Sequence, residues 1–590
     1  MLTARRIYLY VVSGVALGLL LAGCTSLVSL LLDQLGMGPR GGFLAGAPVD
    51  REALSIAIAL IAVGLPLWGL HWWFTERLVR RPDEDGDLER RSIARALYLA
   101  IVPAVTLWIT AAAAADVIRD GIRTVTDTQV WDESGVYVFG LFTGDLGQAG
   151  SLALAVVVGV AWAYHVWVRA RDARAGPLVG AAAWVSRLYL YGAALYAIFA
   201  TLTASANLIE TGLRMAVDRP PIDQASDWWA LAVTGALAQV LVAGVVWAGH
   251  WGYSLRLRAM PDWRGAAERV SRVRATYLMA VVLASTIPVI VAVSQGLAAL
   301  LMWGLDVGPT RDGYLVAQDM IGPLLAWAPF AVAWWWHRRR AAQEGFERDG
   351  QAGARAARRV ADYVQAAAGL AFVGVGLARV VGIVLDVAAG SAPIGEPARW
   401  WGEELSTFVS FAVVGLPVWL GSWYLCQRRR GSMPAWEAGS TARRAYLFLV
   451  VGVTTVAAGI SLAWLLYLGI RVALDLRPGF DAAETSGPLG VLVIAGLLLA
   501  YHLYVLRGDL AVRAEPVPAA AGAPAAVAVA VGEMPAGAEA MAAAAVEVTE
   551  ELVISGPPGA DFDAVNATLR ERLPAGFSMR VVRHGAGTAG

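Results

Sequence analysis

Twelve apolar stretches of this chain are each long enough to cross a lipid bilayer. A spanning helix needs roughly 20 mostly apolar residues, because each residue advances the helix by about 1.5 Å. Backbone polar groups in hydrocarbon must pair within their own segment, so each stretch is predicted to be a helix. The predicted spans are residues 7–32, 53–75, 97–118, 148–169, 188–213, 228–253, 276–304, 316–337, 362–389, 405–426, 445–471 and 488–506.

The composition agrees with a membrane protein. Hydrophobic residues make up 58% of the chain and charged residues 16%, against about 45–50% and about 25% in soluble domains. Two cysteines, Cys24 and Cys426, are too few for a disulfide framework or a thiolate metal site. The predicted fold class is therefore an all-α polytopic membrane protein with twelve transmembrane helices.

The distribution of arginine predicts the orientation. Arginines gather at the N-terminus and in the connections that follow even-numbered spans, for example at 338–340 and 428–430. Positively charged connections stay in the cytoplasm. Both chain ends are therefore predicted to be cytoplasmic. Acidic residues concentrate in the other connections, for example Asp120, Asp127 and Glu133, which agrees with this orientation.

The spans are predicted to form six parallel two-helix repeats. The first helix of each repeat opens with Arg and Tyr, and successive tyrosines are 83–91 residues apart: Arg6/Tyr8, Arg95/Tyr98, Arg187/Tyr189, Arg274/Tyr277, Arg359/Tyr363 and Arg444/Tyr446. The second helix closes with Trp-x-x-His at Trp68/His71, Trp162/His165, Trp247/His250 and Trp334/His337, with the variants Trp419/Ser422 and Leu499/His502. The predicted repeats are residues 1–90, 91–180, 181–268, 269–355, 356–438 and 439–513. Six such units could close into a ring or pair into three, and the sequence leaves both open.

The paired Arg-Tyr and Trp-x-x-His motifs resemble a family of bacterial multi-pass membrane proteins that carry domain of unknown function 5671. The resemblance covers residues 1–510, and Ser422 and Leu499 depart from the pattern. It implies a bacterial cytoplasmic membrane location and a helix-pair unit, and it supplies no activity.

The N-terminus allows two interpretations. Arg5 and Arg6, an apolar stretch and Leu21-Ala22-Gly23-Cys24 resemble a lipoprotein signal with an acylation site at Cys24. However, the apolar run continues to Leu32, and the Arg-x-Tyr motif at its start recurs where no signal is possible. We therefore expect this segment to be retained as the first span.

The repeated histidines are candidate functional residues. His71, His165, His250, His337 and His502 stand at the arginine-rich ends of the second helices. The favoured interpretation is an interfacial belt, with Trp at headgroup level and His near a helix C-terminus. The alternatives are hydrogen bonding between adjacent units, or a functional site such as a proton relay or haem ligation.

Polar residues inside the spans form a second group of candidates. Arg379 is the one basic residue within a predicted span, and Asp386, two turns further on, is its expected partner; lining a cavity is the alternative role. Asn207 and Gln295 are expected to form hydrogen bonds between helices. Together with Gln239, these side chains would line the pathway if the protein were a transporter.

The tail is predicted to be a separate module. Residues 514–545 are almost all Ala, Pro, Gly and Val, which is typical of a linker. Residues 546–583 are predicted to form a strand, a helix and a second strand, a small α/β module. About 38 residues rarely hold a core alone, so the module is expected to bind a protein partner or a second copy of itself.

No residue set matches a catalytic, nucleotide-binding or metal-binding motif. The predicted function is a non-catalytic membrane scaffold or sensor, without cofactor or nucleic acid, whose partners are the lipid bilayer and a protein bound by the tail. The alternatives are a transporter or channel for a small solute or ion, and a haem-binding or other redox membrane protein.

Overall fold

The computed structural model describes residues 2–37, 50–126, 147–178, 180–216, 228–307, 313–345, 352–390, 399–476 and 479–514. The chain divides into two parts, residues 1–516 and 517–590, and the described residues all lie in the first part. The predicted linker beyond residue 514 and the predicted strand-helix-strand module lie outside the described residues.

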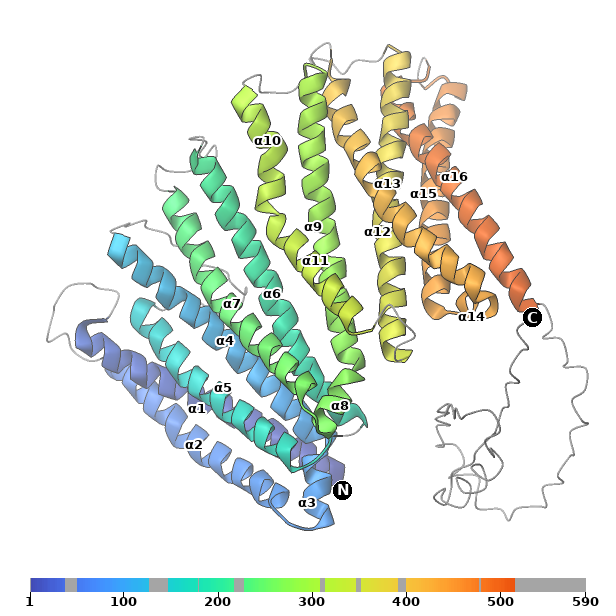
Figure 1. The fold of residues 1–590 in the computed structure, drawn as a ribbon. Coiled ribbons are helices and arrows are strands. Elements are labelled where there is room, and N and C mark those ends of the chain that lie inside the picture. The colour runs from blue at the N-terminus through green and yellow to red at the C-terminus, as the bar shows by residue number, and fades with distance from the viewer. Residues whose placement is uncertain are drawn as a thin grey trace, which may run out of the picture. The chain divides into compact units, whose positions relative to one another are not determined.

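Twelve long helical segments of the described residues are apolar enough to span a membrane, as the sequence predicts (Figure 1). The first helices of the six repeats are α1 (Leu2–Leu32), α4 (Ile93–Thr126), α6 (Gly180–Ala216), α9 (Arg272–Gly304), α12 (Ala352–Ala388) and α15 (Thr441–Ala473). The second helices are α2 (Arg51–Val79), α5 (Gly147–Ala175), α7 (Trp228–Ala259), α10 (Gly313–Ala326) with α11 (Ala328–Gln343), α13 (Trp401–Ser432) and α16 (Ala482–Ala514). A short π-helical turn, η1 (Asp33–Met37), follows α1, and Cys24 lies within α1.

The eighth span is broken, whereas the sequence predicts one continuous helix over 316–337. α10 ends at Ala326 and α11 begins at Ala328, with Trp327 between them. Pro323 lies in the last turn of α10, and Pro329 stands at the second position of α11. Proline removes a backbone donor and displaces the preceding turn, which accounts for the break.

The helices pack in chain order. The two helices of each repeat pack against each other, and the first helix of each repeat also packs against the repeat that follows. For example, α4 contacts α6 and α7, and α9 contacts α12 and α13. Among the described helices the substantial contacts thus run between consecutive repeats, as an open series and not a ring.

Three short helices each connect two consecutive repeats, which groups the six repeats into three pairs. α3 (Glu84–Arg90), α8 (Trp263–Arg269) and α14 (Pro434–Ala438) lie in the connections from the first to the second, the third to the fourth and the fifth to the sixth repeat (Figure 1). The buried apolar residues also form three clusters, which contain Tyr98, Tyr277 and Tyr446 and lie mainly in one pair each. We call these pairs the first (α1–α5), second (α6–α11) and third (α12–α16) four-helix units.

The turn that starts α8 shows why the sequence forms a short helix there. The Asp262 side chain accepts hydrogen bonds from the backbone N–H groups of Arg264 and Gly265, which caps the helix. A Cβ atom at Gly265 would lie 1.9 Å from the carbonyl oxygen of Met260, so only glycine fits. Asp83 and Gly86 form the equivalent turn at α3.

Candidate functional site

Each four-helix unit contains one arginine that is almost completely buried. The three are 1% exposed and stand in the first turn of the even-numbered repeats: Arg95, Arg274 and Arg443. A serine three residues earlier accepts a hydrogen bond from the backbone N–H of each arginine: Ser92, Ser271 and Ser440. The helix start therefore fixes where each guanidinium group enters the interior.

In the first unit, Arg95 contacts three other helices. Its Nε donates to Asp172 of α5 at 2.7 Å, its Nη2 to Glu76 of α2 at 2.8 Å, and its Nη1 to the Tyr10 hydroxyl of α1 at 3.4 Å. The Tyr10 hydroxyl in turn donates to Glu89 of α3 at 3.0 Å. One guanidinium group therefore joins all four long helices, and Tyr10 links it to the short helix α3.

The second unit has the same arrangement. Arg274 donates two hydrogen bonds to Glu344, of 2.9 and 2.7 Å, and a third to the Tyr191 hydroxyl at 3.1 Å. Tyr191 donates to Glu268 of α8. Because two parallel N–H groups bind one carboxylate, the pair is held in a single orientation.

The third unit repeats it once more. Arg443 donates to both carboxylate oxygens of Asp509 and, at 3.3 Å, to the Tyr363 hydroxyl. Tyr363 donates to Glu437 of α14 at 2.8 Å. We call these three sets the arginine clusters: Tyr10/Glu89/Arg95/Asp172, Tyr191/Glu268/Arg274/Glu344 and Tyr363/Glu437/Arg443/Asp509.

A second arginine in each unit binds the glutamate of the short helix. The pairs, formed from the start of the first long helix, are Arg6–Glu89 at 2.7 Å, Arg187–Glu268 at 3.3 Å and Arg359–Glu437 at 3.1 Å. Each buried carboxylate thus receives a charged partner as well as a tyrosine hydroxyl. Buried charges that are paired and hydrogen-bonded in this way are tolerated in protein interiors.

Aromatic rings cover one side of each guanidinium group. In the first unit the Trp72 ring lies 5.1 Å from the Tyr98 ring at an interplanar angle of 27°, and the Arg95 guanidinium lies 5.6 Å from the Trp72 ring centre. Trp251 with Tyr277, and Trp423 with Tyr446, repeat this stack. The aromatic face attracts the cation and excludes water from the ion pairs.

The repeated histidines form tyrosine hydrogen bonds inside their own repeat. In all five the Nδ1 atom contacts the backbone carbonyl four residues earlier, and the Nε2 atom faces a tyrosine hydroxyl: His71–Tyr8, His165–Tyr98, His250–Tyr189, His337–Tyr277 and His502–Tyr446. The distances between Nε2 and the hydroxyl are 3.2–3.4 Å. The carbonyl accepts a hydrogen bond from Nδ1–H, so Nε2 is the ring nitrogen that pairs with the tyrosine hydroxyl.

The structure does not present these histidines as an exposed belt. His165 and His502 are 0% exposed, and both ring nitrogens of each are occupied. Hydrogen bonding between adjacent repeats instead involves the tryptophans: Trp162 donates to Tyr189 at 3.0 Å and Trp247 to Tyr277 at 3.1 Å.

Two of the repeat motifs are out of register in the sequence prediction. Tyr363 was aligned with Tyr8, but its contacts with Arg443 and Glu437 are those of Tyr10. The position equivalent to Tyr8 is Ala361, which explains why Ser422 replaces histidine in the same repeat. Likewise Arg443, and not Arg444, is the equivalent of Arg95. Sequence spacing could not choose between Ala361 and Tyr363 or between Arg443 and Arg444. The choice depends on which side chain faces inward and joins the arginine cluster.

Two carboxyl groups of the second cluster, both outside the spans, have pKa values shifted in opposite directions. Burial raises the pKa of Glu268, and its bonds with Tyr191 and Arg187 only partly offset this. Burial also acts to raise the pKa of Glu344, but the hydrogen bonds and charge of Arg274 outweigh it and lower the pKa.

The expected pair of Arg379 with Asp386 is not formed. Arg379 binds Glu404, in the first turn of α13, at 2.5 Å, and both side chains are more than a third exposed. Asp386 is buried and accepts a hydrogen bond from Ser486 of α16 at 2.6 Å. The Arg379 side chain therefore extends toward the helix end, as long cationic side chains do near a membrane surface.

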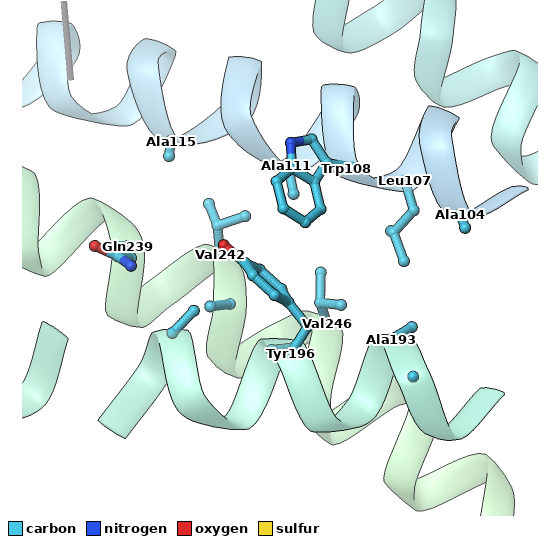
Figure 2. A pocket seen from close by; sticks show the side chains of 14 residues that line it. Ala104, Leu107, Trp108, Ala111, Ala115, Ala193, Tyr196, Gln239, Val242 and Val246 are labelled. Atoms are coloured by element: carbon cyan, nitrogen blue, oxygen red, sulfur yellow. The ribbon is translucent and has the colours of Figure 1, made fainter. Parts of the chain in front are cut away.

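The polar candidates in mid-span do not converge. Asn207 and Gln295 are exposed, and neither forms a hydrogen bond with any residue that the structure describes, so the expected interhelical bonds are absent there. Gln239 faces a small apolar cavity between α4, α6 and α7 (Figure 2). The structure thus provides no shared polar pathway for these three side chains within the described residues.

Most of the arginine-cluster residues are missing from the sequence candidates. The motif Glu-x-x-Ser-x-x-Arg, which occurs at residues 89–95, 268–274 and 437–443, would have marked the glutamate and the arginine of each cluster. A carboxylate seven residues after a repeated histidine would have marked Asp172, Glu344 and Asp509. Both signals recur only in alternate repeats, so a search for six equal units does not find them. Within the described residues, no three His, Cys, Asp or Glu side chains are placed to hold a metal ion.

These features define an integral membrane protein built from tandem four-helix units, each joined by a buried arginine cluster. The chain belongs to the family described as "Domain of unknown function (DUF5671)", whose model matches residues 6–142, 220–328 and 359–497. The first and third matches begin at Arg6 and Arg359, which are equivalent in the structure, and each extends across two repeats. The second match starts before α7 and ends at the start of α11, so it too includes parts of two repeats, and each match is longer than a single helix pair. No curated protein and no solved structure matches the chain.

Proposed function

We propose that the protein is a non-catalytic scaffold or sensor of the bacterial cytoplasmic membrane, with both ends in the cytoplasm. The observation that carries this proposal is that each buried guanidinium group of the arginine clusters has hydrogen-bonding partners. Each buried guanidinium group is bound by carboxylate, hydroxyl and aromatic partners that come from all the long helices of its unit. Such a network favours one rigid arrangement of the helices, and a rigid platform is what a scaffold requires.

The alternatives have less support. A transporter or channel would be favoured by a polar cavity between repeats, but the cavity beside Gln239 is almost wholly apolar. Haem ligation would need a free histidine nitrogen, but the ring nitrogens of the five repeated histidines are engaged by carbonyls and tyrosines. We therefore expect the purified protein to be colourless.

Transport can be tested in proteoliposomes. The full chain would be reconstituted, and proton and chloride fluxes would be followed with entrapped pH-sensitive and chloride-sensitive dyes under an imposed membrane potential. The scaffold proposal expects rates equal to those of protein-free liposomes. A flux that depends on the protein and is lost in Arg379→Leu or Gln239→Leu would contradict it and support the transporter alternative.

The proposed interaction module is the predicted tail at 546–583. If this segment forms the predicted helix, the spacing of Val565, Leu569 and Leu573 would place them in one apolar stripe, which would dock on a partner or a second copy. Self-association would be measured by light scattering of the detergent-solubilised full chain. The double variant Val565→Asp/Leu569→Asp is expected to lower the mass to that of one chain. Ala567→Asp, on the opposite face of the same predicted helix, is the control and should leave the mass unchanged. A single-chain mass for the unaltered protein would exclude self-association through the tail.

A further inference from the structure

A cavity of about 180 Å³ lies between the first and second four-helix units. Figure 2 shows it lined by the middle turns of α4, α6 and α7, all of which are candidate membrane spans, and the cavity is partly open to the outside. Alanine and glycine form much of its wall, among them Ala111, Ala193, Ala197 and Ala200. Its volume resembles that of the roughly 150 Å³ apolar cavities that stay free of water and bind benzene.

The repeated fold does not by itself require this cavity. We call the contact between two neighbouring four-helix units a seam. The equivalent seam lies between the second and third four-helix units, where α9 packs against α12 and α13. Aligning the buried tyrosines and the repeated histidine position places Ile290 at Ala111, Phe372 at Ala200 and Phe411 at Gln239. Ile290 is 2% exposed, and the rings of Phe372 and Phe411 pack edge to face with centres 5.4 Å apart. Small residues at the first seam therefore leave a space that larger ones occupy at the second.

Three residues with polar side-chain atoms line this space, Trp108, Tyr196 and Gln239, and Gln239 is the one that carries an amide. It is half-buried in the middle of α7, with its amide beside the cavity, and no described residue forms a hydrogen bond with its side chain (Figure 2). In hydrocarbon, an amide without a partner is costly, because no water can replace the missing hydrogen bond. A plain acyl chain would fill the space but would leave this amide unsatisfied.

The remaining wall is aromatic. The rings of Trp108 and Tyr196 lie 4.6 Å apart at an interplanar angle of 37°, and both line the cavity. A flat ring can pack against such a wall over a large area. The site thus combines an apolar volume of the size of one ring, an aromatic wall and one amide donor in the middle turns of three candidate spans.

We propose that this cavity binds the head ring of an isoprenoid quinone. The ring would pack against Trp108 and Tyr196, a ring carbonyl would accept a hydrogen bond from the Gln239 amide, and the hydrocarbon tail would leave through the open side of the cavity into the lipid. This site is independent of the proposed scaffold function, and it assigns a ligand to the seam between two units.

The test is equilibrium binding of decylubiquinone to the full chain in lipid nanodiscs, followed by quenching of tryptophan fluorescence. Saturable binding is expected. Ala111→Ile/Ala200→Phe, which copies the second seam, should abolish it while leaving the melting temperature unchanged or higher, because the cavity is filled. Gln239→Leu should weaken binding about tenfold, the loss of one hydrogen bond. Gln295→Leu, an exposed glutamine on α9, is the matched control and should bind normally.

Three results would overturn the proposal. Absence of saturable binding would exclude a quinone site. Equal binding by the cavity-filled variant would show partition into lipid. Unweakened binding to Gln239→Leu, with equal competition by palmitate, would identify the cavity as an acyl-chain site.

Discussion

At the scale of single residues, the stability of the folded protein depends on three buried guanidinium groups. Each replaces the water it loses with carboxylate, hydroxyl and aromatic partners from several helices, so its removal would leave unpaired carboxylates in the interior. Breaking a buried ion pair by deleting one partner costs about 3–5 kcal/mol, whereas exposed ion pairs contribute about 0–1 kcal/mol. The buried arginines should therefore dominate the response to mutation.

Arg274→Leu is expected to destabilise the protein by about 3–5 kcal/mol, because Glu344 loses its bidentate partner. Arg272→Leu removes an exposed arginine two residues away on the same helix and should change stability by less than about 0.5 kcal/mol. The measurement is unfolding of the purified protein in mixed micelles. Equal losses in both variants would show that the cluster contributes nothing beyond a surface charge.

The tyrosine–histidine bond can be isolated by a double-mutant cycle. Tyr98→Phe and His165→Leu should each destabilise the first unit, and the double variant should lose about 0.5–1.5 kcal/mol less than the sum of the two. The fifth repeat carries Ala361 and Ser422 at these positions, so the fold accommodates loss of both partners together. Strict additivity in the cycle would mean that the two side chains do not interact.

The second cluster should make stability depend on pH through Glu344. Its folded-state pKa is lowered, so the stabilisation is present above the ordinary carboxyl range and is lost as the pH falls through and below about 4.3. Glu344→Gln should therefore flatten the acid side of the stability profile. Glu268 has a raised pKa, so its contribution has the opposite sign and diminishes as the pH rises. Glu268→Gln should thus still lose stability as the pH falls. If Glu344→Gln lost as much stability at acidic pH as the unaltered protein, this assignment would be refuted.

At the scale of helices, close approach between neighbours depends on glycine. A Cβ atom at Gly490 of α16 would lie 2.2 Å from the backbone oxygen of Ala378 in α12, and one at Gly496 would contact nothing within 4 Å. The first glycine therefore sets the distance between the fifth and sixth repeats. Short contacts of this kind are common where membrane helices pack.

Gly490→Ala is expected to destabilise the third four-helix unit by about 1–3 kcal/mol, since two helix backbones must separate. Gly496→Ala is the control on the same helix, and it should be neutral or stabilising by up to about 1 kcal/mol, because alanine loses less backbone entropy. Thermal unfolding in detergent would compare the two variants. A tolerated Gly490→Ala would show that α12 and α16 can adjust without cost.

At the scale of the whole molecule, the remaining prediction concerns orientation. Reporter fusions in the 119–145, 306–315 and 475–487 connections are expected to report the periplasm. Fusions at 80–90, 340–355 and 510 should report the cytoplasm, because these segments belong to the arginine-rich connections and arginine-rich connections stay in the cytoplasm. A cytoplasmic signal from any fusion of the first group would overturn the predicted orientation.

The number and positions of the candidate spanning helices and their grouping into helix pairs follow from the amino-acid sequence alone. Apolar length and repeated motifs are local properties, and a bilayer leaves a long apolar segment few alternatives to a helix. Which repeats pair with each other is visible only in the folded structure. The difference between alternate repeats lies in single side chains such as Arg95, which meets Tyr10, 85 residues earlier, and Asp172, 77 residues later, only when four helices pack. The folded structure also decided that Arg379 binds Glu404 and not Asp386, because spacing along one helix cannot reveal a partner on the next.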